Sequence, residues 1–188
     1  MYNLGNIFAY CALCAPVYIL LRWLYCRKKR SSCGFGGELL RFGFVMYLVA
    51  LLSMTVVPDW SFTQYEGQKL GIEIYWRTGQ IQLVPFRTVL MYLRDNVGRF
   101  KALVNLLGNV VLFMPIGFLP PLLWQKWRLF RNMILLSVAF PLFIEIEQHF
   151  IGRSSDIDDL LLNTLGILLG YVLWLLAHRL CARKREAS

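Results

Sequence analysis

The sequence predicts an all-α polytopic membrane protein with about five transmembrane helices, an outer N-terminus and a cytoplasmic C-terminus. Three observations support this fold class: an apolar composition, apolar windows of spanning length, and an uneven distribution of Lys and Arg among the segments that join the windows. The whole chain, residues 1–188, is interpreted as a single membrane domain.

The composition excludes an ordinary soluble domain. Hydrophobic residues make up 57% of the chain and charged residues 16%, and the mean hydropathy is positive. Soluble domains carry about 25% charged residues, so the lipid bilayer is the main partner expected. The net charge of +9 does not indicate nucleic-acid binding, because basic residues at the ends of apolar spans set topology and contact anionic lipid.

Five windows approach the length of about 20 mostly apolar residues that a helical span needs. They cover roughly residues 7–25, 39–57, 102–123, 132–150 and 160–178. The segments that follow the first, third and fifth windows, counted together with the adjoining window ends at Arg22 and Arg41, carry thirteen of the 20 Lys and Arg residues. The positive-inside rule places these segments in the cytoplasm and the N-terminus outside. No external segment contains a cysteine, so no external disulfide framework is expected.

The longest external segment is loop 58–101, which is expected to contain a β-hairpin and an interfacial helix. Residues 71–86, GIEIYWRTGQIQLVPF, alternate apolar and polar positions on both sides of Arg77–Gln80, which predicts a hairpin that turns there. After Pro85, aromatic and aliphatic residues are mixed with Arg and Lys. This mixture is typical of a helix that lies along the lipid headgroups.

Polar residues gather at the outer end of the last window. At about 100° per residue, one narrow helical stripe holds Asp156, Asp159, Asn163, Gly166 and Gly170. Asp158 falls on the opposite side of the helix. Because the GxxxG spacing allows another helix to approach closely, the stripe is expected to face the bundle rather than lipid.

The two preceding windows carry polar positions at the same membrane side. Charged and amide side chains near hydrocarbon are costly unless they are paired or solvated, so these positions predict a shared, outward-facing polar pocket. The candidate ligand-binding residues are Glu145, Gln148, Arg153, Asp156, Asp159, Asn163, Asn105 and Asn109.

A structural explanation covers part of this pattern. Ser155 with Asp158 fits an N-terminal capping box for the last helix, and acidic residues at a helix start suit the helix dipole. Capping does not explain Glu145 and Gln148 on another helix, or Asn163 a full turn inside the last one. A functional pocket is therefore favoured over capping and interhelical hydrogen bonds alone.

Four motifs follow one another between roughly residues 82 and 171. They are QLVPF, then NLLGNVVLFMPIGFLPPL, then Glu145-x-x-Gln148, then Arg153-x-x-Asp156-x-x-Asp159-x-x-x-Asn163-x-x-Gly166-x-x-x-Gly170. In these motifs the chain resembles the VanZ-like family, although Gln82 stands where that resemblance leads us to expect Asn. The resemblance implies a multi-pass protein of the bacterial plasma membrane. The name-giving member is associated with low-level resistance to teicoplanin, a lipid-tailed glycopeptide antibiotic.

Two functions remain open for the predicted pocket, beside a purely structural role. The first is binding of a lipid-linked cell-wall precursor or a lipoglycopeptide, with Arg153 pairing with a phosphate or carboxylate of the ligand. The second is a membrane enzyme acting on a phospholipid or a polyprenyl-phosphate-linked glycan, in which Asp156, Asp159 and Glu145 could hold a divalent metal. No catalytic residue can be named, and the motifs of known lipid-phosphate enzymes are missing from the sequence. Binding without a cofactor is therefore favoured over catalysis.

Overall fold

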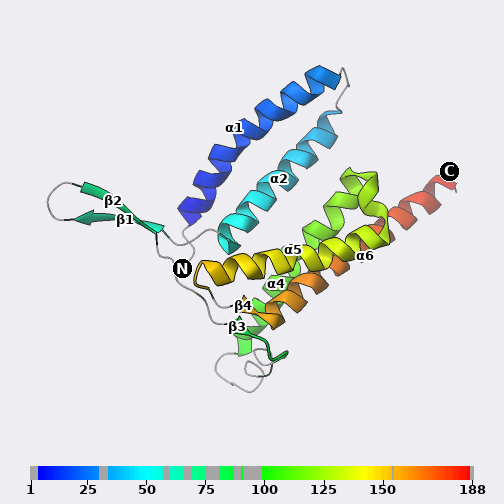
Figure 1. Cartoon of the computed structure of the whole chain (residues 1–188). Coiled ribbons are helices and arrows are strands. Elements are labelled where there is room, and N and C mark those ends of the chain that lie inside the picture. Colours follow the sequence, from blue (N-terminus) through cyan, green and yellow to red (C-terminus); the bar gives the residue numbers. More distant parts are fainter. Residues whose placement is uncertain are drawn as a thin grey trace. The chain divides into compact units, whose positions relative to one another are not determined.

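The computed structural model describes residues 4–29, 34–56, 60–65, 69–74, 81–86, 90, 99–153 and 155–186. Contacts divide the chain into two compact units, residues 1–78 with 150–153 and residues 79–149 with 154–188. Helices α1 and α2 belong to the first unit, and helices α4, α5 and α6 belong to the second (Figure 1).

The described part of the chain contains five helices that are long and apolar enough to cross a membrane. They are α1 (Leu4–Lys29), α2 (Phe35–Thr55), α4 (Arg99–Leu123), α5 (Phe130–Phe150) and α6 (Ile157–Glu186), with a short 3₁₀ helix, η1 (Gln125–Arg128), between α4 and α5. The predicted spans are confirmed. The largest difference is α6, which continues to Glu186 because its last residues include good helix formers and neither Gly nor Pro.

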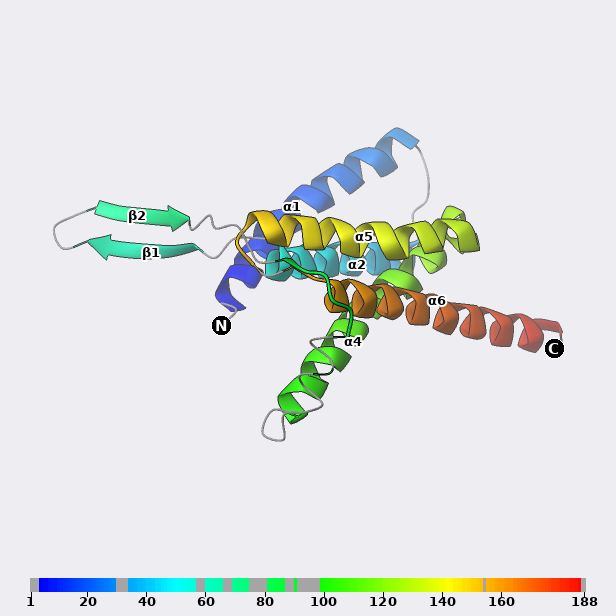
Figure 2. The same ribbon diagram turned by 60° about the horizontal axis from the view of Figure 1, so that its bottom comes forward.

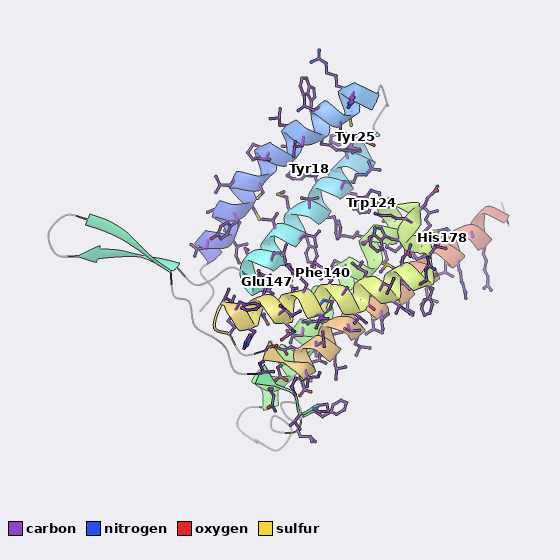
Figure 3. All side chains as sticks on the ribbon, in the orientation of Figure 1. Tyr18, Tyr25, Trp124, Phe140, Glu147 and His178 are labelled. Carbon is purple, nitrogen blue, oxygen red and sulfur yellow. The ribbon has the colours of Figure 1, made fainter. Side chains whose placement is uncertain are left out.

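In the first unit, α1 and α2 pack against each other as an antiparallel pair (Figure 1). The Tyr18 ring, on the side of α1 that faces α2, lies 5.8 Å from the ring of Phe42 (Figure 3). Closer to the short connection between the helices, the Arg22 guanidinium donates to the Glu38 carboxylate. Aromatic packing and an ion pair therefore hold the two helices together.

The first unit also contains a β-hairpin, at a position different from the predicted one. Strand β1 (Trp60–Tyr65) pairs antiparallel with β2 (Lys69–Ile74). Residues 71–74 thus pair with the preceding segment, so the predicted partner, residues 81–86, was wrong. Alternation of apolar and polar residues identifies an extended segment but does not identify the strand with which it pairs.

Residues 81 and 82 have another partner within the second unit. Strand β3 (Ile81–Gln82) lies parallel to β4 (Ser155–Asp156), close to the start of α6 (Figure 2). This pairing brings the QLVPF segment next to the N-terminal end of α6. The predicted turn at residues 77–80 and most of the predicted interfacial helix at 87–101 lie outside the described residues.

Helices α4 and α6 of the second unit touch backbone to backbone. Gly166 of α6 lies against the backbone carbonyl oxygen of Val110 on α4. One turn further along α6, Gly170 lies against the carbonyl of Met114, and Gly117 of α4 makes the reciprocal contact with α6. A Cβ atom at any of these glycines would overlap the facing oxygen. The predicted close approach at the GxxxG stripe is confirmed, with α4 as the partner helix.

Helix α5 packs one face against both of these helices. Its buried residues recur every three or four positions, as Met133, Ser137, Pro141, Ile144 and Glu145. The ring of Phe140, labelled in Figure 3, lies 6.3 Å from that of Phe113 on α4. The Phe130 ring lies 6.2 Å from that of Tyr171 on α6. Three helices therefore share one core, and their polar ends come together beside β4.

Gly170→Ala is expected to lower the thermal midpoint of unfolding, because the added Cβ overlaps the Met114 carbonyl and overpacking costs about 1–3 kcal/mol. Gly108→Ala is the matched control, since among the described residues no atom outside the backbone of its own helix turn lies within 4 Å of the position of an added Cβ. Alanine at that helical position is expected to stabilise by about 0.5–1 kcal/mol. Tryptophan fluorescence of the detergent-solubilised protein measures both midpoints. Equal midpoints for the two variants would contradict the close backbone contact.

Candidate functional site

The carboxylate of Glu145 links the end of α5 to the start of α6. Glu145 is only 4% exposed. Its Oε2 atom accepts hydrogen bonds from the Ser155 hydroxyl at 2.9 Å and from the backbone N–H of Asp156 at 3.0 Å. Its Oε1 atom is also buried and has no hydrogen-bond partner among the described residues. Such an oxygen is unusual, because nothing compensates the loss of its hydration.

Asp156 precedes α6 and caps it. The helix begins at Ile157, and Oδ1 of Asp156 accepts a hydrogen bond from the N–H of Asp158 at 3.0 Å, which is an N-cap arrangement. The predicted capping box of Ser155 and Asp158 was therefore wrong, because the Ser155 hydroxyl donates to Glu145 instead. The sequence placed Asp156 on the helical stripe, but Asp156 lies in β4, one residue before α6 begins.

Asp158 was not among the candidate residues, yet it is only 2% exposed. Its Oδ1 atom accepts a hydrogen bond from the backbone N–H of Phe86 at 2.5 Å. Phe86, the last residue of QLVPF, lies in a turn and has a φ of 62°, which is uncommon for a bulky residue. Asp158 thus fastens this turn to the start of α6. Nothing in one sequence could link two residues 72 positions apart.

Asp159 and Asn163 lie on the α6 face that meets α4. The Nδ2 atom of Asn109 on α4 donates to Oδ1 of Asp159 at 2.7 Å. One turn further along, Asn163 is 5% exposed, and its Oδ1 atom has no hydrogen-bond partner among the described residues. The predicted stripe therefore faces the interior of the second unit.

The remaining candidates are placed as follows. Gln148 is half-buried on α5, three residues after Glu145. Arg153 belongs to the first unit, where its Nη1 atom donates to the backbone carbonyl of Met54 at 2.7 Å. The backbone of Asn105 belongs to α4, and its side chain lies outside the described part of the chain.

The residues that these contacts bring together are called the polar cluster. They are Asn109, Glu145, Ser155, Asp156, Asp158 and Asp159. The carboxylates of Asp156 and Asp159 lie close enough to interact electrostatically with that of Glu145. In the described ranges, no three His, Cys, Asp or Glu side chains are grouped so that they could hold a metal ion. The cluster is rich in acceptor oxygens and therefore suits a ligand with N–H and O–H groups.

Glu145→Ala is expected to lower the free energy of unfolding by about 1–3 kcal/mol, because the Ser155 hydroxyl and the Asp156 N–H lose their acceptor. Glu147→Ala is the matched control: Glu147 is half-buried two positions later on the same helix (Figure 3), and a change below about 0.5 kcal/mol is expected there. Denaturant unfolding in mixed micelles measures both values. Comparable losses in the two variants would contradict the central position given to Glu145.

Comparison with known proteins shows which family this chain matches. The model of the VanZ/LLP1 family matches residues 44–178. The chain is also similar to "Uncharacterized membrane protein YwnJ" of Bacillus subtilis (strain 168), with 34% identity over 86 residues. That alignment covers 46% of this chain and 57% of the relative, so the matched part spans little more than half of the relative's length. No solved structure matches.

The family match includes the whole of α4 and α5, part of α2 and most of α6, and every residue of the polar cluster. It also agrees with the resemblance that the sequence motifs carry. The chain is a multi-pass membrane protein, and it belongs to the VanZ/LLP1 family.

Proposed function

We propose that this protein binds the head group of a lipid-tailed molecule at the polar cluster, on the outer side of the plasma membrane. The proposed ligands are a lipid-linked cell-wall precursor or a lipoglycopeptide antibiotic of the teicoplanin type. Membership of the VanZ/LLP1 family supports this choice. The name-giving member of the VanZ-like family, which the chain resembles, is associated with teicoplanin resistance. The chemistry of the cluster supports it independently.

The observation that carries the proposal is the unpartnered Oε1 atom of Glu145. A buried acceptor without a donor costs about 1–3 kcal/mol or more when it is charged. Helix packing alone does not require this cost, since a Gln would fill the same space and still offer an acceptor to Ser155 and Asp156. A ligand that donates an N–H or O–H group to Oε1 would compensate it. The buried Oδ1 of Asn163 is a second acceptor of this kind on the adjoining helix.

The charge of the cluster indicates which part of a ligand it would take. Carboxylates of Glu145, Asp156 and Asp159 gather at one end of the three helices, and carboxylates accept hydrogen bonds but do not donate them when ionised. Sugar hydroxyls, amide N–H groups and ammonium groups fit such a set. Glycopeptides and wall precursors carry all three kinds of group.

Helices α5 and α6 also offer an apolar surface against which the lipid tail of the ligand can lie. Exposed apolar residues line α5 and α6 over the turns next to the cluster, including Phe143, Ile146, Leu161 and Leu165. In a membrane these side chains face acyl chains, so a tail can remain in the bilayer while the head group reaches the acceptors. The positive-inside rule predicts that this end of the helices is the outer one.

Lipid identification by mass spectrometry tests the proposal. The gently purified wild type is expected to retain a specific wall precursor, or added teicoplanin, and Glu145→Gln is expected to lose most of it. The substitution keeps the size of the side chain and removes its charge. Glu147→Gln is the matched control and should retain the ligand.

Three results are informative. Retention of the same lipids by all three proteins would contradict the proposal. Conversion of the retained lipid to a product would favour the enzyme over the binding protein. Loss of the ligand only in Glu145→Gln, at an unchanged thermal midpoint, would support binding at the cluster.

A further inference from the structure

The first unit holds an excess of positive charge where α1 and α2 come together near their connection. The Nε and Nη2 atoms of Arg22 donate to the two carboxylate oxygens of Glu38 at 2.5 and 2.7 Å, which forms a bidentate pair. The Nη1 atom of Arg41 donates to the same carboxylate at 2.5 Å. Two guanidinium groups therefore share one carboxylate, and one positive charge remains.

The guanidinium of Arg41 keeps N–H donors that Glu38 does not accept. Its Nε and Nη2 atoms donate to none of the described residues, and the Arg41 side chain is 28% exposed. The Nε–Nη2 edge is one of the planar forks that match two oxygens of a phosphate. We propose that this edge of Arg41 binds the phosphate of an anionic phospholipid, with Arg22 and Glu38 holding the guanidinium in place.

The surroundings favour a lipid rather than another phosphate compound. The guanidinium of Arg27 lies 5.2 Å from the centre of the Trp23 ring, that of Arg22 lies 4.8 Å from the centre of the Tyr25 ring, and Lys28 is exposed. Trp and Tyr beside Arg and Lys at the end of a spanning helix are typical of the headgroup level of a bilayer. Arg27 and Lys28 add to the positive field there.

Folding of the first unit does not explain the whole arrangement. One arginine suffices to neutralise Glu38 and to link α1 to α2, and Arg22 makes that link with two hydrogen bonds. Arg41 lies three residues after Glu38 on the same helix, so its bond to Glu38 joins no further element. The inference does not depend on the function proposed for the polar cluster, which lies in the second unit.

The test is competition between two lipids with the same acyl chains, phosphatidylglycerol and phosphatidylcholine, on the purified full-length protein. Native mass spectrometry measures the ratio of the two bound lipids. The wild type is expected to prefer phosphatidylglycerol, and Arg41→Gln to lower the preference about five-fold, since one basic residue near anionic lipid contributes about 1 kcal/mol. Arg41→Lys, which keeps the charge and loses the fork, is expected to lower it less.

Arg131→Gln is the matched control, because Arg131 is exposed in the first turn of α5 and belongs to the other unit. It should leave the preference unchanged. The proposal is overturned if the wild type binds both lipids equally, or if a folded Arg41→Gln or Arg41→Lys keeps the full preference. It is also overturned if millimolar inorganic phosphate displaces phosphatidylglycerol, because the site would then be one for free phosphate.

Discussion

The close contact of α4 with α6 is the constraint on which the polar cluster depends. Glycines at 117, 166 and 170 bring the two backbones together, and no other residue type fits against the facing carbonyl oxygens. The same approach brings Asn109 within hydrogen-bond distance of Asp159, two turns before Gly166 on the same face of α6. In a bilayer, where lipid tails are as apolar as the helices, such packing is a main source of helix association. The glycines thus place polar groups as well as stabilise the unit.

Burial at the helix ends determines what the cluster can do. Glu145 and Asp158 each fasten a different segment to the start of α6: Glu145 fastens the end of α5 through Ser155 and Asp156, and Asp158 fastens the turn at Phe86. Each therefore has a structural task. Glu145 keeps one further oxygen that these contacts leave unpartnered in the described structure, and this oxygen separates the candidate site from an ordinary helix cap.

Much of the fold could be predicted from the sequence, because it rests on local signals. Span length, the charge asymmetry and the GxxxG stripe indicated five helices and a close contact of the last one, and the structure and the family match agree with them. The side of the membrane on which the cluster lies is still a prediction from the positive-inside rule. Glu145, Asp159 and Asn109 could be singled out from the sequence because each is a polar residue on an apolar helix, and the side chains of all three lie in the polar cluster. That they bind a ligand is still a prediction.

Other parts could not be predicted, because they depend on contacts between distant segments. The pairing of Ile81 with Ser155 and the bond of Asp158 to Phe86 leave no periodic pattern in either segment. Asp158 was not selected as a candidate because it lies on the opposite side of the helix from the polar stripe. On that side its carboxylate accepts the hydrogen bond from Phe86. The capping prediction was wrong because either Ser155 or Asp156 could be the N-cap residue of α6. The Ser155 hydroxyl donates to the buried Glu145 instead, and Asp156 caps the helix.

The proposed function requires that the polar cluster faces the cell exterior and that a ligand reaches it there. Accessibility of position 155 tests it most directly, with Ser155→Cys in a chain from which the other cysteines are removed. The account predicts that a membrane-impermeant maleimide labels this cysteine in intact cells, that added teicoplanin or wall precursor slows the labelling, and that a chain retaining only Cys181 is labelled after permeabilisation alone. Labelling of position 155 only after permeabilisation, or a rate that neither ligand changes, would contradict the account.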